Sequence, residues 1–151
     1  IHINNLDFNQ FVDKLNPKIK ELADLEKELE KRLNNFIKVG CVASDMSLDT
    51  IEPLATYQEA NIAFKKKRNH KGVSKLEISQ YKGYIVYALL KMYAKYNIRS
   101  ELHIGPTRNN NTKAYIDIGA DAGFDNISDA SSLTNLSASS IKSYISFLEY
   151  V

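Results

Sequence analysis

The chain has 151 residues, of which 44% are hydrophobic and 25% charged, and 20 Lys and Arg against 18 Asp and Glu give a formal charge of +2. This is ordinary globular composition, which excludes collagen-like, coiled-coil or wholly disordered descriptions and predicts one domain. No run approaches the roughly 20 apolar residues of a membrane span, the start lacks a secretory signal, and the lone Cys41 excludes an internal disulfide, so we expect a cytoplasmic protein.

The first two predicted elements are amphipathic helices. Residues 7–15 carry apolar side chains at i, i+3, i+4 and i+7, behind a cap at Asn5 or Asp7. A second helix is predicted over 18–39, because its apolar residues recur at helical spacing, and Gly40 is a natural end for it. The run 41–45 is too short for a helix, so it predicts a buried strand that closes at Ser44 and Asp45.

Two further helices are predicted over 56–68 and 74–97, because each begins with residues at capping-box spacing. These pairs are Thr56 with Glu59 and Ser74 with Glu77. The first of the two helices ends in a basic stretch, and cations in a last turn complement the helix dipole.

The remaining residues predict a second strand over 98–104 and irregular loops over 105–111 and 119–129, where Gly, Pro, Asn and Asp gather. A last helix is predicted behind Ser137 or Ser139, with an apolar face that runs from Ile141 to Leu148. Strands that alternate with long helices predict parallel βα units, so the predicted fold class is α/β.

Three side chains are candidates for chemistry, because residues at the carboxyl ends of parallel strands face the mouth of a βα active site. They are Asp45, which with Ser44 closes the first strand, His103 near the end of the second, and Arg108 in the next loop. They supply a proton acceptor, a group that titrates near neutral pH and an anion clamp. The alternatives are a helix-capping Asp45, a hydrogen-bonded core histidine and an arginine that fastens its loop.

The wider sequence resembles the uronate isomerases, metal-dependent sugar-acid isomerases of the amidohydrolase superfamily. Residues 102–112 read LHIGPTRNNNT and residues 119–129 read GADAGFDNISD, similar to the family patterns HIGxxRNNN and GxDxGFDSIxD. Upstream, residues 31–45 are similar to the family pattern KRxxxFxxxGCxxSDH, with Met46 where the family carries His.

The resemblance implies a (β/α)8 TIM barrel, of which 1–151 would be one helix-rich central segment rather than a complete barrel, since such barrels need at least about 200 residues. In that frame Cys41 to Asp45 is barrel strand 4, Arg99 to Ile104 is strand 5, and Leu76 to Asn97 belongs to the helical layer between them. The opening at Ile1 without Met and the end at Val151 also lead us to expect an excised segment.

The resemblance also implies the reaction, an interconversion of D-glucuronate with D-fructuronate and of D-galacturonate with D-tagaturonate through an enediol. We expect Arg108 to contact an anionic oxygen, His103 to steer a hydroxyl or carbonyl proton, and Asp45 to orient the substrate or share in proton transfer. The family's divalent metal, zinc by expectation, would rest on strands absent here, so we expect no metal site in the segment and no activity from it alone. We expect a homo-oligomer.

Two other classes of function stay open. Five Lys or Arg within residues 65–71 fit either a nucleic-acid surface or a solvated helix end, and we expect no nucleic-acid or membrane partner because the overall charge is nearly balanced. The other class is a non-catalytic helical segment that self-associates, since strands cut from a barrel expose unpaired edges.

Overall fold

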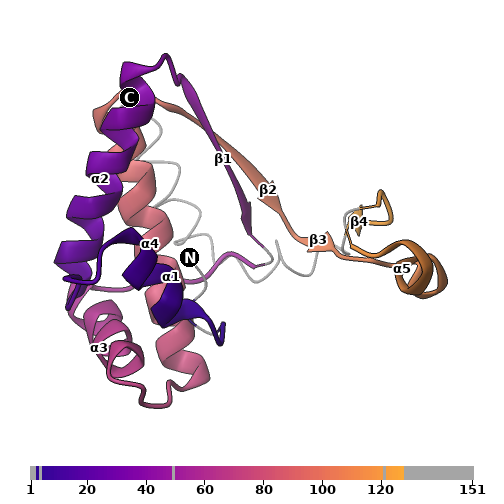
Figure 1. Cartoon of the computed structure of the whole chain (residues 1–151), viewed down its shortest axis with the longest axis horizontal. Helices are drawn as coiled ribbons and strands as arrows, with labels where there is room; N and C mark the ends of the chain where they lie inside the picture. The colour runs from indigo at the N-terminus through magenta and orange to yellow at the C-terminus, as the bar shows by residue number, and fades with distance from the viewer. Residues whose placement is uncertain (1–2, 4, 49, 121, 128–151) are drawn as a thin grey trace.

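The computed structural model describes residues 3, 5–48, 50–120 and 122–127. The predicted last helix, from Ser137 to Leu148, lies outside the described residues. Figure 1 shows a body of helices at one side, two long strands beside it, and an arm that projects away from both.

Four helices form the body: α1 (Phe8–Leu15), α2 (Leu22–Lys38), α3 (Tyr57–Arg68) and α4 (Lys75–Lys95). The capping boxes predicted at Thr56 and Ser74 are confirmed, because each hydroxyl accepts a hydrogen bond from the backbone N–H of the glutamate three residues later. Helix α2 begins later than predicted, at Leu22, because the Glu21 N–H donates to the Asp24 carboxylate there.

An aromatic cluster fills the centre of this body. The rings of Phe8 and Phe64 meet edge to face with centroids 5.8 Å apart, and Phe8 meets Tyr81 in the same way at 6.1 Å. All three are buried, together with aliphatic residues of the first four helices, with Ile3 before α1 and with Ile19 between α1 and α2. Such a core supplies most of the stability of a helical body, because burial of a large apolar side chain is worth about 1.5–3 kcal/mol.

Three helices end in Schellman motifs, with a residue in the left-handed region just after the helix. Gly40, His70 and Asn97 hold these positions after α2, α3 and α4, with φ of 93°, 56° and 53°. After α2, the Gly40 N–H donates to the Ile37 carbonyl and the Cys41 N–H to the Phe36 carbonyl, both at 3.0 Å. Gly40 therefore ends the helix as predicted.

Strands β1 (Ala43–Leu48) and β2 (Arg99–Ile104) pair in parallel, in register from Ala43 with Arg99 to Leu48 with Ile104. The predicted parallel pairing is confirmed, whereas the predicted bounds of the first strand, 41–45, are wrong. Because Cys41 completes the end of α2, the strand starts two residues later, and its pairing continues through Ser47 and Leu48.

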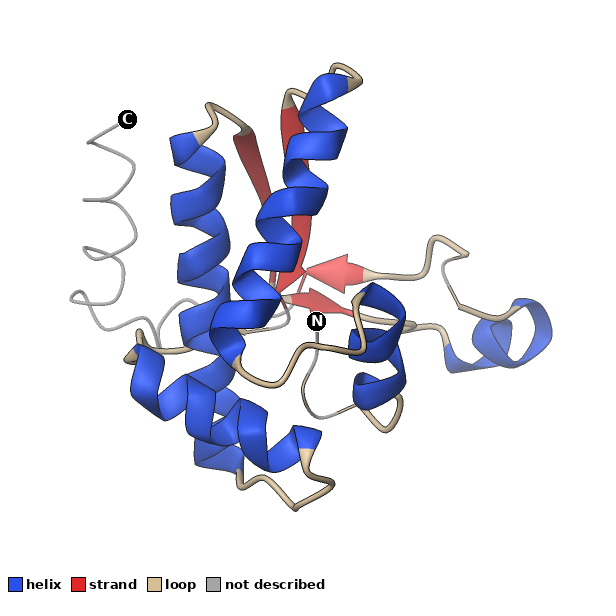
Figure 2. Ribbon diagram, turned by 60° about the vertical axis from the view of Figure 1, so that its left-hand side comes forward, coloured by secondary structure: helices blue, strands red, loops and turns tan. Residues whose placement is uncertain are grey.

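Exposure alternates along both strands. The prediction that the first strand is buried is therefore wrong. One face is exposed and polar, and the other is half-buried, which is the alternation expected of a sheet with one solvated face. The exposed face carries Ala43, Asp45, Ser47, Arg99, Glu101 and His103. Figure 2 shows the two strands running alongside the long helices of the body.

The arm consists of β3 (Pro106–Thr107), α5 (Thr112–Ile118) and β4 (Asn126–Ile127), with β3 and β4 antiparallel. The predictions of irregular structure over 105–111 and 119–129 are therefore wrong at the two short strands. Gly105 turns the chain from β2 directly into β3 with a φ of 66°, which its missing Cβ permits.

Candidate active site at the ends of strands β1 and β2

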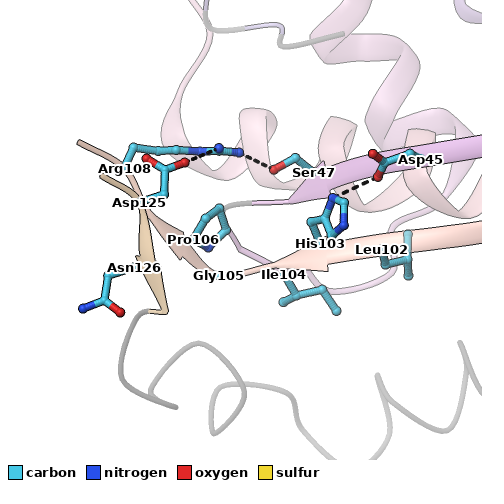
Figure 3. A pocket seen from close by; sticks show the side chains of 10 residues that line it. All are labelled: Asp45, Ser47, Leu102, His103, Ile104, Gly105, Pro106, Arg108, Asp125 and Asn126. Atoms are coloured by element: carbon cyan, nitrogen blue, oxygen red, sulfur yellow. Dashed lines mark hydrogen bonds and ion pairs between the residues drawn. The ribbon is translucent and has the colours of Figure 1, made fainter. Parts of the chain in front are cut away.

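Asp45 and His103 form a pair across the two parallel strands. The His103 Nδ1 lies 3.0 Å from the Asp45 Oδ1 (Figure 3). The His103 Nε2 lies 3.4 Å from the Glu101 Oε1. Asp45 and Glu101 stand opposite each other in register, and His103 lies two residues further along the same face of β2. Each ring nitrogen thus faces a carboxylate, and only the imidazolium form donates from both.

Exposure decides between the alternatives for these two residues. The side chains of His103 and Asp45 are 56% and 60% exposed, so His103 is not a core histidine. Asp45 does not cap a helix, because it lies inside β1 rather than at its end. The prediction that Asp45 closes the strand is wrong, since pairing with β2 continues for three more residues.

Arg108 is held by two side chains from different parts of the chain. Its Nη1 donates to the Asp125 Oδ2 and its Nη2 to the Ser47 Oγ, each at 2.6 Å (Figure 3). The Asp125 Oδ1 also accepts from the Asn109 backbone N–H at 2.9 Å. The Asn109 N–H, followed by Arg108, lowers the pKa of the Asp125 carboxyl below its ordinary value of 3.8.

The three predicted residues line one cavity of about 700 Å³. The Arg108 guanidinium donates to Ser47, and Ser47 pairs in register with His103. The guanidinium and the imidazole therefore lie near the same position along the sheet. The contact with Asp125 confirms the alternative that Arg108 fastens its loop. Arg108 also lines the cavity, so the two roles are compatible. The lining residues are Asp45, Ser47, Leu102, His103, Ile104, Gly105, Pro106, Arg108, Asp125 and Asn126.

Sequence reasoning missed three polar residues beside the predicted ones. Ser47 and Glu101 lie two residues from Asp45 and His103, and a spacing of two puts side chains on one face of a strand. That spacing could have identified both. Asp125 stands within the GFD part of the family pattern, but its contact with Arg108 depends on how the arm folds back, which the sequence pattern does not reveal.

A metal ion has no complete ligand set in the part of the chain that the structure describes. No group of three or more His, Cys, Asp or Glu side chains there could hold one. His103 lies between the carboxylates of Asp45 and Glu101 and pairs with both. These residues do not fit a metal by themselves, and we derive no step through one.

The basic stretch at the end of α3 forms ion pairs within the body. Lys65 lies 2.9 Å from Glu21, Lys66 pairs with Glu77, and Arg68 lies 2.6 Å from Asp13. Charges already paired across elements favour a structural role over a nucleic-acid surface, which requires free cations along a groove. Among the described helices, none combines the length and hydropathy needed to cross a membrane.

Comparison with known proteins identifies the family. Residues 1–144 match the model of the glucuronate isomerase family, so the chain belongs to the uronate isomerases. It is 40% identical over 140 residues to a uronate isomerase of Clostridium perfringens, and 36% identical over 143 residues to one of Brachyspira hyodysenteriae. These matches cover 89% and 91% of the chain and 30% of each relative, so the chain spans about a third of the length of its relatives.

Solved structures agree. The uronate isomerase of Thermotoga maritima matches 84% of the chain with a TM-score of 0.69 at 25% identity. The glucuronate isomerase of Caulobacter crescentus matches 89% with a TM-score of 0.67, and its 18% identity bears on the fold alone. Each match covers 29% of the larger chain. The predicted fold class is therefore confirmed at the level of an α/β segment with an open sheet, part of a TIM-barrel-type isomerase fold.

Proposed function

We propose that this chain is the central segment of a uronate isomerase that interconverts D-glucuronate with D-fructuronate and D-galacturonate with D-tagaturonate. One observation carries the proposal. Asp45, from within β1, lines one cavity with His103 and Arg108 towards the carboxyl ends of two parallel strands, in a chain that belongs to this family. Active sites of (β/α)8 enzymes lie at that end of their strands.

In this proposal, β1 and β2 are strands 4 and 5 of the barrel. Their parallel pairing and the long helical connection between them support this assignment. Within the described residues β1 and β2 pair only with each other, which leaves one edge of each strand for neighbouring barrel strands. The exposed polar face that carries Asp45 and His103 would then face the barrel interior.

The isomerisation moves a proton between adjacent carbons through an enediol or enediolate, so it needs a base, an electrophile for the carbonyl oxygen and a cation for the carboxylate. Arg108 is the cation and contacts an anionic oxygen of the substrate. His103 steers a hydroxyl or carbonyl proton. Asp45, 3.0 Å from His103, orients that imidazole and through it the substrate.

The divalent metal of the proposed enzyme, for which we favour zinc, would be held by residues outside this segment. When bound, such an ion supplies Lewis-acid stabilisation of a developing oxyanion. Asp45, His103 and Arg108 contribute proton handling and anion binding.

The test replaces His103 by Asn and Arg108 by Met in the full-length protein that carries this segment. Each variant should lower kcat/KM for glucuronate at least about tenfold, which corresponds to roughly 1.4 kcal/mol of transition-state stabilisation. The melting temperature should stay near that of the wild type, because neither side chain belongs to the buried core of the described residues. Near-normal kcat/KM in both variants would remove the proposed site.

A second candidate, self-association of the segment, is favoured by exposed apolar residues around the end of α2. Phe36, Val39 and Val42 are 60%, 82% and 70% exposed. Apolar surface beside unpaired strand edges promotes association between chains. Sedimentation of the purified segment tests this candidate, since a monomer at all concentrations would contradict it.

A further inference from the structure

The guanidinium of Arg108 is fixed from two sides before any substrate arrives. Asp125, just before β4, accepts from Nη1, and Ser47, on β1, accepts from Nη2, both at 2.6 Å. An arginine side chain has many rotamers, and holding it in place costs conformational entropy. Two short hydrogen bonds from separate elements meet that cost within the fold itself.

Asp125 fixes the backbone as well as the side chain. Its second carboxylate oxygen accepts the N–H of Asn109, a residue in the left-handed region with a φ of 54°. The next N–H, of Asn110, donates to the Phe124 carbonyl at 2.9 Å. One carboxylate therefore closes the turn after Arg108 and orients the Arg108 side chain.

Ser47 links Arg108 to the rest of the cavity. Ser47 pairs in register with His103, and neighbouring strands lie about 4.8 Å apart. The hydroxyl that accepts from Arg108 thus stands beside the imidazole that contacts Asp45. A guanidinium has five N–H donors, and the contacts with Asp125 and Ser47 leave donors for an anionic ligand.

We propose that Asp125 and Ser47 are positioning residues. They hold the Arg108 guanidinium beside His103, so that the remaining N–H groups of Arg108 bind the anionic oxygen of the sugar acid. This inference rests on the proposed function, because it specifies how that site presents its cation. Arg108 is then a preorganised hydrogen-bond donor rather than a mobile cation.

The kinetic test uses the full-length protein and the variants Asp125→Asn, Ser47→Ala and Ser47→Thr. Asp125→Asn should lower kcat/KM for glucuronate about tenfold, less than or equal to the loss in Arg108→Met. Ser47→Ala should cause a smaller loss, and Ser47→Thr should restore it because threonine keeps the accepting hydroxyl. In an Arg108→Met background, Asp125→Asn should have no further effect, since coupled residues are non-additive.

A second measurement does not depend on turnover. Phenylglyoxal modifies accessible arginines, and mass spectrometry of the peptide that contains Arg108 gives its modification rate. Asp125→Asn and Ser47→Ala should raise this rate several-fold, and Ser47→Thr should not. Asp117→Asn is the matched control, because Asp117 is an exposed carboxylate on the arm that lies outside the cavity lining.

The two measurements separate the two proposals. Faster modification in Asp125→Asn, with normal kcat/KM in Arg108→Met, would keep the anchoring and remove the proposed function. Activity lost in Arg108→Met, with both modification and kcat/KM unchanged in Asp125→Asn, would overturn the positioning role and keep the function. A loss in Asp125→Asn that persists in the Arg108→Met background would also overturn it, because Asp125 would then act through the fold.

Discussion

The helical body and the pair of long strands differ in where their side chains go. In the body, Phe8, Phe64 and Tyr81 are buried at the centre of a cluster that extends through the first four helices. On the strands, every described residue of β1 and β2 is exposed or half-buried, and one face carries polar side chains. The helices of the body bury their apolar side chains against one another, whereas the two strands expose a face of polar side chains.

This difference separates stability from chemistry within one chain. Among the described residues, the lining of the cavity includes none of the buried core residues of the body. A (β/α)8 barrel has the same division, with conserved chemistry at the carboxyl ends of strands and packing elsewhere. The segment contains a folding core and, in the proposed function, one part of an active-site mouth.

The largest expected effect follows for activity. The 151-residue chain alone should not isomerise glucuronate at a rate comparable with the full-length protein, because catalysis depends on a preorganised constellation of which it holds one part. The measurement is a coupled assay on the purified segment with added Zn²⁺, and the full-length protein is the positive control. Metal-dependent turnover by the segment, free of host enzyme, would contradict this expectation.

The next largest effect tests the body. Phe64→Ala should lower the free energy of unfolding of the chain by about 3–5 kcal/mol, because Phe64 is fully buried against Phe8 and Tyr81. Urea unfolding measures this change. The control Leu76→Ala, at a side chain that is 67% exposed, should stay within about 0.5 kcal/mol of the wild type. Equal losses in both variants would show that this cluster does not hold the body together.

Much of the body could be predicted from the sequence because its signals are local. Capping pairs such as Thr56 with Glu59 act within one turn, and the structure confirms them. The start of β1 could not be predicted in the same way, because Cys41 satisfies the end of α2 before the strand begins. The short strands of the arm were missed since two-residue pairings leave no periodic pattern.

The sequence predicts the site only as far as the pairing of the two strands determines which side chains meet. Asp45 and His103 come together because the parallel register of β1 and β2 puts them on one face, two positions apart, and the alternation of side chains along a strand can be inferred from sequence. The contacts of Arg108 with Asp125 and Ser47 join residues 17 and 61 positions apart. Such contacts depend on tertiary structure, so no local pattern reveals them.

A third prediction concerns the junction between the body and the segment that follows β1. A Cβ at Gly83, on α4, would lie 2.0 Å from the Pro53 carbonyl oxygen. Alanine is favoured over glycine in a helix by about 0.5–1 kcal/mol, but this overlap should outweigh it, and we expect Gly83→Ala to destabilise the chain by about 1–3 kcal/mol. Gly72→Ala is the control, because nothing lies within 4 Å of its added Cβ. Increased stability of Gly83→Ala in urea would mean that Pro53 does not rest on α4.

The smallest effect is a pH dependence confined to the body. The Lys66 ammonium, with the Ser74 backbone N–H, lowers the pKa of Glu77 from 4.5 to about 2. Because the folded pKa is lower than the unfolded one, the carboxylate contributes stability above pH 4.5 that is lost as the pH falls towards 2.

Glu77→Gln should therefore reduce the fall of the urea midpoint across this window, while leaving its slope between pH 6 and 8 unchanged. Lys66→Gln should do the same, and adding it to Glu77→Gln should change little further, since the two side chains form one ion pair. Wild-type and Glu77→Gln curves that run parallel from pH 6 to 2 would show that this pair contributes nothing to the stability of the body.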